Sequence, residues 1–125
     1  MQLCKAYCIF WVKEKSLAFA IRIVKLAKVL QNQKEFVLSR QILRSGTAIG
    51  ALVREAEHAE STKDFIHKLA ISLKESNETD YWLEILFETE YINKEEFLEL
   101  QLANHELLKL LTSIIKTSKA KIGRF

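Results

Sequence analysis

The sequence contains no proline, only three glycines and two cysteines, and no apolar run long enough to cross a bilayer. Proline and glycine interrupt helices most strongly, so their scarcity argues against a chain built from many short turns. Cys4 and Cys8 lie close together without a second pair of ligands, which excludes a zinc site of the CxxC…CxxC type, and we expect reduced thiols. The apolar stretch 6–12 leads into charged residues rather than a cleavage site, so we expect a cytoplasmic protein.

Residues that favour helices dominate the rest of the chain, in four amphipathic segments. A chain of 125 residues forms one domain that can bury a core without disulfides. We predict an all-α fold, an antiparallel up-down-up-down four-helix bundle over residues 13–117. The predicted flanks are an irregular N-terminal lead-in at 1–12 and a basic C-terminal tail at 118–125.

Apolar spacing and capping signals predict the helix limits. Two adjacent rows of apolar residues place the first helix at about 13–30, and the second should span about 35–58. Ser61 and Asp64, and likewise Asn93 and Glu96, have the spacing of N-cap boxes, which start the third and fourth helices. The two rows on the first helix consist of Leu17, Ile21 and Val24, and of Ile23, Leu26 and Leu30.

Two glycines interrupt the second helix, four positions apart on one face. Gly46 and Gly50 each cost about 1 kcal/mol relative to alanine, so we expect them to allow a close approach of a neighbouring helix. The predicted partners are Ser72 and Ser76, in the small and polar middle of the third helix. Chance tolerance of two glycines is the alternative.

The net charge of +3 is distributed unevenly. Residues 1–34 carry seven basic side chains against one acid, whereas residues 61–92 carry three lysines against seven acids. In the predicted topology the first helix starts where the fourth ends, so we expect one basic patch that attracts nucleic acid. No aromatic residue alternates with these lysines, so such binding would be non-specific, and a merely solvated helix face is the alternative. The candidate residues are Lys15, Arg22, Lys25, Lys28, Lys116, Lys119 and Lys121, with Arg40, Arg44 and Arg54 as a second row.

Several segments together resemble a known family. They are Gln41-Ile42-Leu43-Arg44-Ser45-Gly46-Thr47-Ala48-Ile49-Gly50-Ala51, Arg54-Glu55-Ala56, the stretch from Ser61 to Glu75, and Thr79-Asp80-Tyr81-Trp82-Leu83. The resemblance, over about 13–115, is to the bacterial four-helix bundle family that includes proteins encoded in intervening sequences of 23S ribosomal RNA genes. That family is related to the accessory variability proteins of diversity-generating retroelements. One departure is Leu52, where the family usually has asparagine.

This resemblance implies a closed bundle that assembles into a ring-like homo-oligomer, pentamers being known in the family. For the retroelement relatives it also implies a basic surface that binds nucleic acid and reverse transcriptase. It supplies no catalytic residues. The sequence itself is consistent with the lack of catalytic residues, because the chain has no nucleophile elbow, phosphate-binding glycine loop or dinucleotide fingerprint. We therefore predict a protein that is not an enzyme and uses no cofactor.

One polar cluster qualifies as a weak metal-site candidate. Glu55 and His58 share a face near the end of the second helix, and Asp64 and His67 share one at the start of the third. Carboxylate-x-x-His pairs bind metals in ferritin-like bundles, but there they lie at mid-bundle with further glutamates. Solvated residues around a turn are the favoured interpretation.

Two functions from different classes remain open. The first is a non-enzymatic homo-oligomer with a basic, nucleic-acid-binding surface. The alternative is a protein-protein interaction scaffold whose exposed aromatic residues anchor an oligomer or a partner. The same aromatic residues could instead belong to the core between the third and fourth helices. They are Tyr81, Trp82, Phe87 and Tyr91.

Overall fold

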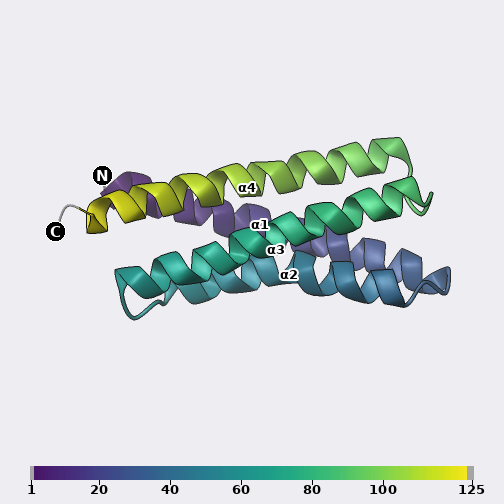
Figure 1. The fold of residues 1–125 in the computed structure, drawn as a ribbon, viewed down its shortest axis with the longest axis horizontal. Coiled ribbons are helices and arrows are strands. Elements are labelled where there is room, and N and C mark those ends of the chain that lie inside the picture. Colours follow the sequence, from purple (N-terminus) through teal and green to yellow (C-terminus); the bar gives the residue numbers. More distant parts are fainter. Residues whose placement is uncertain (1, 124–125) are drawn as a thin grey trace.

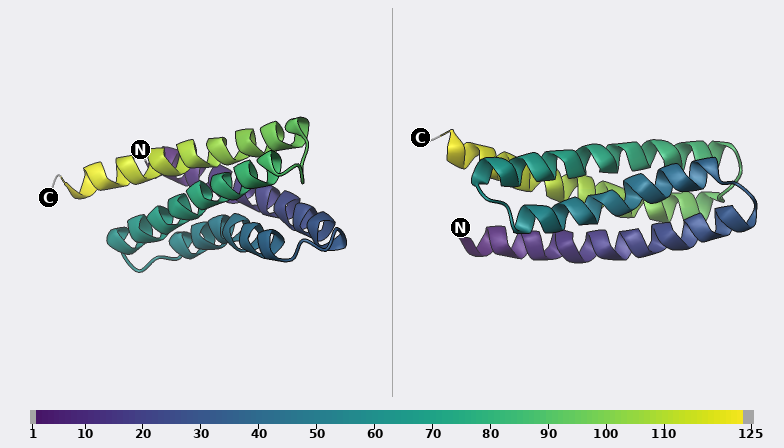
Figure 2. Two further views of the ribbon diagram at one scale, coloured as in Figure 1. Left: turned by 45° about the vertical axis from the view of Figure 1, so that its right-hand side comes forward. Right: turned by 90° about the horizontal axis from the view of Figure 1, so that it is seen from below.

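The computed structural model describes the backbone of residues 2–123 and the side chains of residues 8–123. It contains α1 (Gln2–Asn32), α2 (Val37–Glu57), α3 (Thr62–Glu88) and α4 (Lys94–Ile122). Each helix packs against the next, and α4 returns against α1, so the contacts form a closed cycle of four helices (Figure 1). The predicted up-down-up-down bundle is confirmed, and both termini lie at the end that carries the α2–α3 turn (Figure 2).

The flanks of the bundle are helical where we predicted irregular structure. The helix α1 begins at Gln2 rather than near residue 13, and α4 continues to Ile122. The lead-in contains no glycine or proline that would interrupt a helix, Val12 is completely buried, and Ile9 packs against the core. The prediction of an irregular segment is therefore wrong over 2–12, and that of a separate tail is wrong over 118–122. Residues 1, 124 and 125 lie outside the described chain.

Both predicted N-cap residues are confirmed. The Ser61 hydroxyl accepts a hydrogen bond from the Asp64 amide at 3.0 Å, and the Asn93 side chain accepts one from the Glu96 amide at 2.8 Å. The start of α2 is capped differently, because the Glu35 carboxylate accepts a hydrogen bond from the Leu38 amide at 2.6 Å. Helix α2 consequently begins at Val37, two positions after the predicted start.

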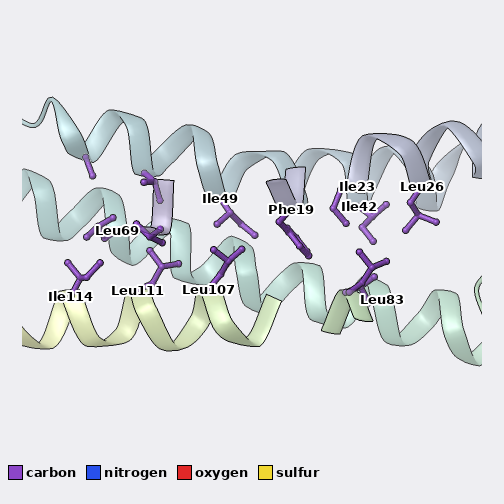
Figure 3. Close-up of a cluster of buried hydrophobic side chains, with 14 of the residues drawn as sticks. Phe19, Ile23, Leu26, Ile42, Ile49, Leu69, Leu83, Leu107, Leu111 and Ile114 are labelled. Atoms are coloured by element: carbon purple, nitrogen blue, oxygen red, sulfur yellow. The ribbon is translucent and has the colours of Figure 1, made fainter. Parts of the chain in front are cut away.

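The core runs along the whole bundle and follows the predicted spacing on α2, α3 and α4. Figure 3 shows branched aliphatic side chains from all four helices along the inside of the bundle, with Phe19 in the middle. On α1 the row with Ile23, Leu26 and Leu30 is buried, as expected. Leu17 and Ile21 from the other row are 43% and 49% exposed, so that row faces outward.

The glycines of α2 face α1 and not α3, which corrects our prediction of their partners. A Cβ built on Gly46 would lie 2.8 Å from Ile23 Cγ2, and one on Gly50 would lie 3.2 Å from Ser16 Oγ. Both distances are shorter than ordinary van der Waals contacts. The close approach that the glycines permit is therefore between α1 and α2.

The serines predicted to face the glycines instead form hydrogen bonds from α3 to both of its neighbours, α2 and α4. Ser72 Oγ donates to the carbonyl oxygen of Ile49 in α2 at 2.9 Å, and Ser76 Oγ donates to Asn104 Oδ1 in α4 at 2.6 Å. Thr79 Oγ1 donates to Ser45 Oγ at 2.9 Å. These side chains are fully buried, so they form a hydrogen-bonded polar layer across three helices in the apolar core.

Candidate nucleic-acid and oligomer interfaces

Three of the ten candidate basic residues are neutralised by ion pairs between helices. Lys15 Nζ lies 2.7 Å from Glu106 Oε1, and Arg22 Nη2 lies 3.2 Å from Glu99 Oε2, which connects α1 to α4. Arg44 connects α2 to α3 through Glu75 and Glu78. Their carboxylates reduce the positive potential at each of these three cations, so these residues are poor candidates for phosphate binding.

Arg44 belongs to a small network that also includes Trp82. Its Nη1 donates to both carboxylate oxygens of Glu75, at 3.2 and 3.1 Å, and its Nη2 donates to Glu78. The Trp82 indole donates to the same Glu78 at 3.0 Å. Hydrogen bonding to Glu75, and then to Glu78, raises the pKa of Arg44, while the indole and then Arg44 lower the pKa of Glu78. The network keeps Arg44 charged and leaves its guanidinium bound to the two glutamates.

The remaining seven candidates form no ion pair within residues 8–123 and lie at separate places. Lys25 and Lys28 are near the end of α1, Arg40 is near the start of α2, and Arg54 is near its end. The others are Lys116, Lys119 and Lys121, in the last turns of α4.

The basic residues of α1 and α4 do not merge into the single predicted patch. The ion pairs Lys15–Glu106 and Arg22–Glu99 fix the register of the two antiparallel helices. Moving seven residues forward along α1 corresponds to moving seven residues backward along α4. By that register Lys116 lies beside the start of α1, roughly 35 Å from the level of Lys28 at 1.5 Å per residue. The prediction that the helix termini share one end was correct, but within residues 8–123 the lysines of α1 that form no ion pair lie near its other end.

The second half of α4 is a basic stretch at the end of the described chain. From 107 to 123 it contains no acidic residue, and in all three views its end extends beyond the α2–α3 turn (Figures 1 and 2). Lys109 lies on this stretch, is exposed and forms no ion pair within residues 8–123. It was absent from our candidates, although the lack of acid after Glu106 would have indicated it.

Three of the four candidate aromatic residues support the core. Phe87 stacks on Phe97 with ring centroids 4.6 Å apart, and Trp82 and Tyr91 are half-buried against the core cluster. Tyr81 is different, because 58% of its surface is exposed and it meets Trp82 edge-on. The aromatic argument for a protein scaffold therefore reduces to one exposed tyrosine.

Two faces of the bundle expose apolar residues. The sequence patterns had assigned some of these residues to the core and had not singled out the others. On α1 they are Phe10, Leu17 and Ile21, and on α4 they are Leu98 and Leu102. Leu102 is 73% exposed, the largest value among the large apolar side chains of the described chain. Such clusters on a small domain are typical of interaction surfaces.

The metal-site candidates do not converge on a common point. Glu55 Oε1 lies 3.3 Å from Lys68 Nζ, and Asp64 Oδ2 accepts a hydrogen bond from the Glu60 amide at 3.2 Å. Glu55, His58 and Asp64 do line one shallow cavity, but Lys68 lines it as well and His67 does not. Among the described residues no group of three or more His, Cys, Asp or Glu side chains is placed to hold a metal ion.

The comparison with known families can now be set beside this geometry. Residues 10–113 match the family model described as 23S rRNA-intervening sequence protein. The chain belongs to this family. None of the helices within residues 2–123 combines the length and the apolar character needed to cross a membrane.

A solved structure supports the same assignment. The chain is similar to a Bacteroides thetaiotaomicron protein described as of unknown function, from the S23 ribosomal protein family, with 58% identity and a TM-score of 0.85. The similarity covers 87% of this chain and 98% of that one. Among curated proteins none matches the chain. The family and the neighbour thus confirm the fold and leave the biochemical role to be argued from the surface.

Proposed function

We propose that this protein is a non-enzymatic homo-oligomer that binds nucleic acid without sequence preference through the end of α4. The observation that carries the proposal is the acid-free stretch of α4, with Lys116, Lys119 and Lys121 free of ion pairs in the described chain. Lysines attract phosphates by charge alone and release counterions on binding. No aromatic side chain lies on the same stretch, so base stacking would contribute little.

Self-association strengthens this proposal physically. Three or four lysines on one chain give only weak binding, but several copies held in one particle engage the same nucleic acid together. The two exposed apolar faces supply a reason to associate. The family is that of the 23S rRNA-intervening sequence proteins, and the solved neighbour is described as from the S23 ribosomal protein family, which makes RNA the first ligand to test.

A salt titration tests the binding. Binding is measured by fluorescence anisotropy with a labelled RNA and a labelled DNA of the same length. For both, log Kd should rise linearly with the logarithm of the salt concentration. Sequences of equal length and strandedness should bind alike. Absence of binding at low ionic strength would contradict the proposal. Binding that persists unchanged in high salt would contradict the electrostatic mechanism.

A further inference from the structure

The turn between α1 and α2 exposes apolar side chains that contribute nothing to the core. Phe36 occupies the N-cap position of α2, forms no side-chain capping hydrogen bond there, and is 55% exposed. Val37, the first residue of α2, is 69% exposed, and Val29, near the end of α1, is 50% exposed. None of the three belongs to the core cluster. Small polar residues are strongly preferred at an N-cap, so neither capping nor core packing explains this phenylalanine.

Basic side chains accompany these apolar residues on both helix ends. Residues 25–40 contain four basic side chains and one acid. The acid, Glu35, accepts a hydrogen bond from the Leu38 amide at 2.6 Å, so it is engaged within the turn itself. Lys28 directly precedes Val29. The basic residues, all exposed and without an ion pair within residues 8–123, are Lys25, Lys28, Lys34 and Arg40.

The α1–α2 turn is also the outermost part of its end of the bundle. In all three views it extends beyond the α3–α4 turn, at the end opposite to both termini (Figures 1 and 2). A projecting apolar tip does not enclose a small molecule, whereas a broad surface meets it first. The α3–α4 side of this end has the opposite charge, because residues 84–96 contain five acids against Lys94 alone. An anionic surface therefore attracts the α1–α2 turn and repels the α3–α4 turn, which selects one orientation of approach.

We propose that the α1–α2 turn docks on an anionic lipid surface, with Phe36 and Val37 entering the boundary between headgroups and acyl chains. The apolar side chains gain from leaving water, and the nearby cations are attracted to acidic headgroups. The cations would attract a nucleic acid too, but a nucleic acid offers no apolar medium for two valines. This inference goes beyond the proposed function, because the turn lies at the end opposite to the basic end of α4.

Co-sedimentation of the full chain with lipid vesicles tests this contact. At low ionic strength the chain should bind vesicles that contain phosphatidylserine at least about tenfold more tightly than vesicles of phosphatidylcholine alone. Phe36→Ser should weaken binding to the phosphatidylserine vesicles by about tenfold, because it removes the largest apolar side chain of the tip. The melting temperature of this variant should not fall, since serine is a preferred N-cap residue.

Tyr81→Ser is the matched control. Tyr81 is an aromatic residue with a similar exposure, 58%, but it lies on α3. This variant should bind vesicles like the native chain. Phe36→Trp should bind at least as tightly as the native chain, because indole rings favour the interface between lipid and water.

Two changes of charge test the orientation. Lys28→Gln should weaken binding to the phosphatidylserine vesicles by about fivefold, since one cation near the surface is lost. The combined change Glu88→Gln and Glu90→Gln should strengthen binding, because both acids are exposed at the α3–α4 turn and repel the same surface. Weaker binding by this double variant would contradict the proposed orientation.

The remaining outcomes separate this contact from the nucleic-acid site. Absence of vesicle binding at low ionic strength would overturn the proposal, and so would vesicle binding that Phe36→Ser leaves unchanged. RNA binding by Phe36→Ser should equal that of the native chain. If Phe36→Ser lost RNA binding and vesicle binding together, the turn would be a nucleic-acid contact and the lipid proposal would be wrong. If the native chain bound these vesicles but no RNA or DNA, the proposed function would be wrong while the lipid contact stands.

Discussion

Ser76 in α3 and Asn104 in α4 exchange two hydrogen bonds in the middle of the core. The Ser76 hydroxyl donates to Asn104 Oδ1 at 2.6 Å, and Asn104 Nδ2 donates to the Ser76 carbonyl oxygen at 2.9 Å. Both residues are fully buried. A one-turn slip of α4 against α3 would leave the amide unsatisfied in an apolar region, so this pair selects one register of the two helices.

Asn104→Ala should lower the free energy of unfolding by about 2–3 kcal/mol, because it leaves the Ser76 hydroxyl without its partner and opens a small cavity. Ser76→Ala should cost less, since alanine fills most of the space of serine. The double variant should be less destabilised than the sum of the single changes. Chemical denaturation of the four proteins measures this coupling, and strict additivity would show that the two residues act independently.

Gly46→Ala should destabilise the protein although alanine favours helices more than glycine. The added Cβ would lie 2.8 Å from Ile23 Cγ2, and overpacking of this kind costs about 1–3 kcal/mol. Gly46→Leu should unfold the protein or dissociate the proposed oligomer. Combining Gly46→Ala with Ile23→Ala should destabilise the protein by less than the sum of the two single changes, which thermal melting would detect. If Gly46→Ala raised the melting temperature, α1 would not approach α2 as closely as this structure has it.

Glu78 should make stability depend on pH in the acid range. Its pKa in the folded protein lies below the ordinary 4.5, because the Trp82 indole and then Arg44 hydrogen-bond to the carboxylate. A lowered folded-state pKa stabilises the protein above the unfolded-state value, and this contribution disappears as pH falls through the folded-state value. Since the side chain is 37% exposed, solvent screening keeps the effect small.

The measurement is the difference in melting temperature between the native chain and Glu78→Gln from about pH 7 to about pH 3, the range around a carboxylate's titration. That difference should be largest near neutrality and should vanish at the acid end. Glu84→Gln serves as control, because Glu84 is exposed and has no ion pair within residues 8–123. A difference that grows as the solution becomes more acidic would reverse the sign assigned here.

Replacing Lys116, Lys119 and Lys121 together with glutamine should weaken binding to any RNA or DNA and flatten its salt dependence. Each lost phosphate contact lowers the slope of log Kd against log salt by about 0.7–0.9. A control with the same change in charge replaces Lys63, Lys74 and Lys94, which are exposed on α3 and at the start of α4. Equal losses in both triple variants would mean that net charge, and not the end of α4, governs binding.

Local signals predicted the four helices and the starts of α3 and α4 well. Ser61 and Asn93 cap their helices through amides three positions away, and the buried residues of α2, α3 and α4 repeat at helical spacing. Such features depend on neighbours within a turn, so the sequence contains them directly. The same reasoning did not decide which side of α1 is buried, because α1 carries apolar residues nearly all round and its periodicity selects no face.

The sequence by itself determined the fold class, three helix-helix links and the concentration of basic residues in α1 and at the end of α4. Only the tertiary structure decided which contacts those residues make. Arg22 and Glu99 are 77 positions apart, and no spacing rule connects them. Gly46 could face either neighbour until packing placed it against Ile23, and Leu17 and Ile21 could be core or surface. Long-range packing resolves these choices, because side chains far apart in the sequence must fill the same interior space and pair with the same charged groups.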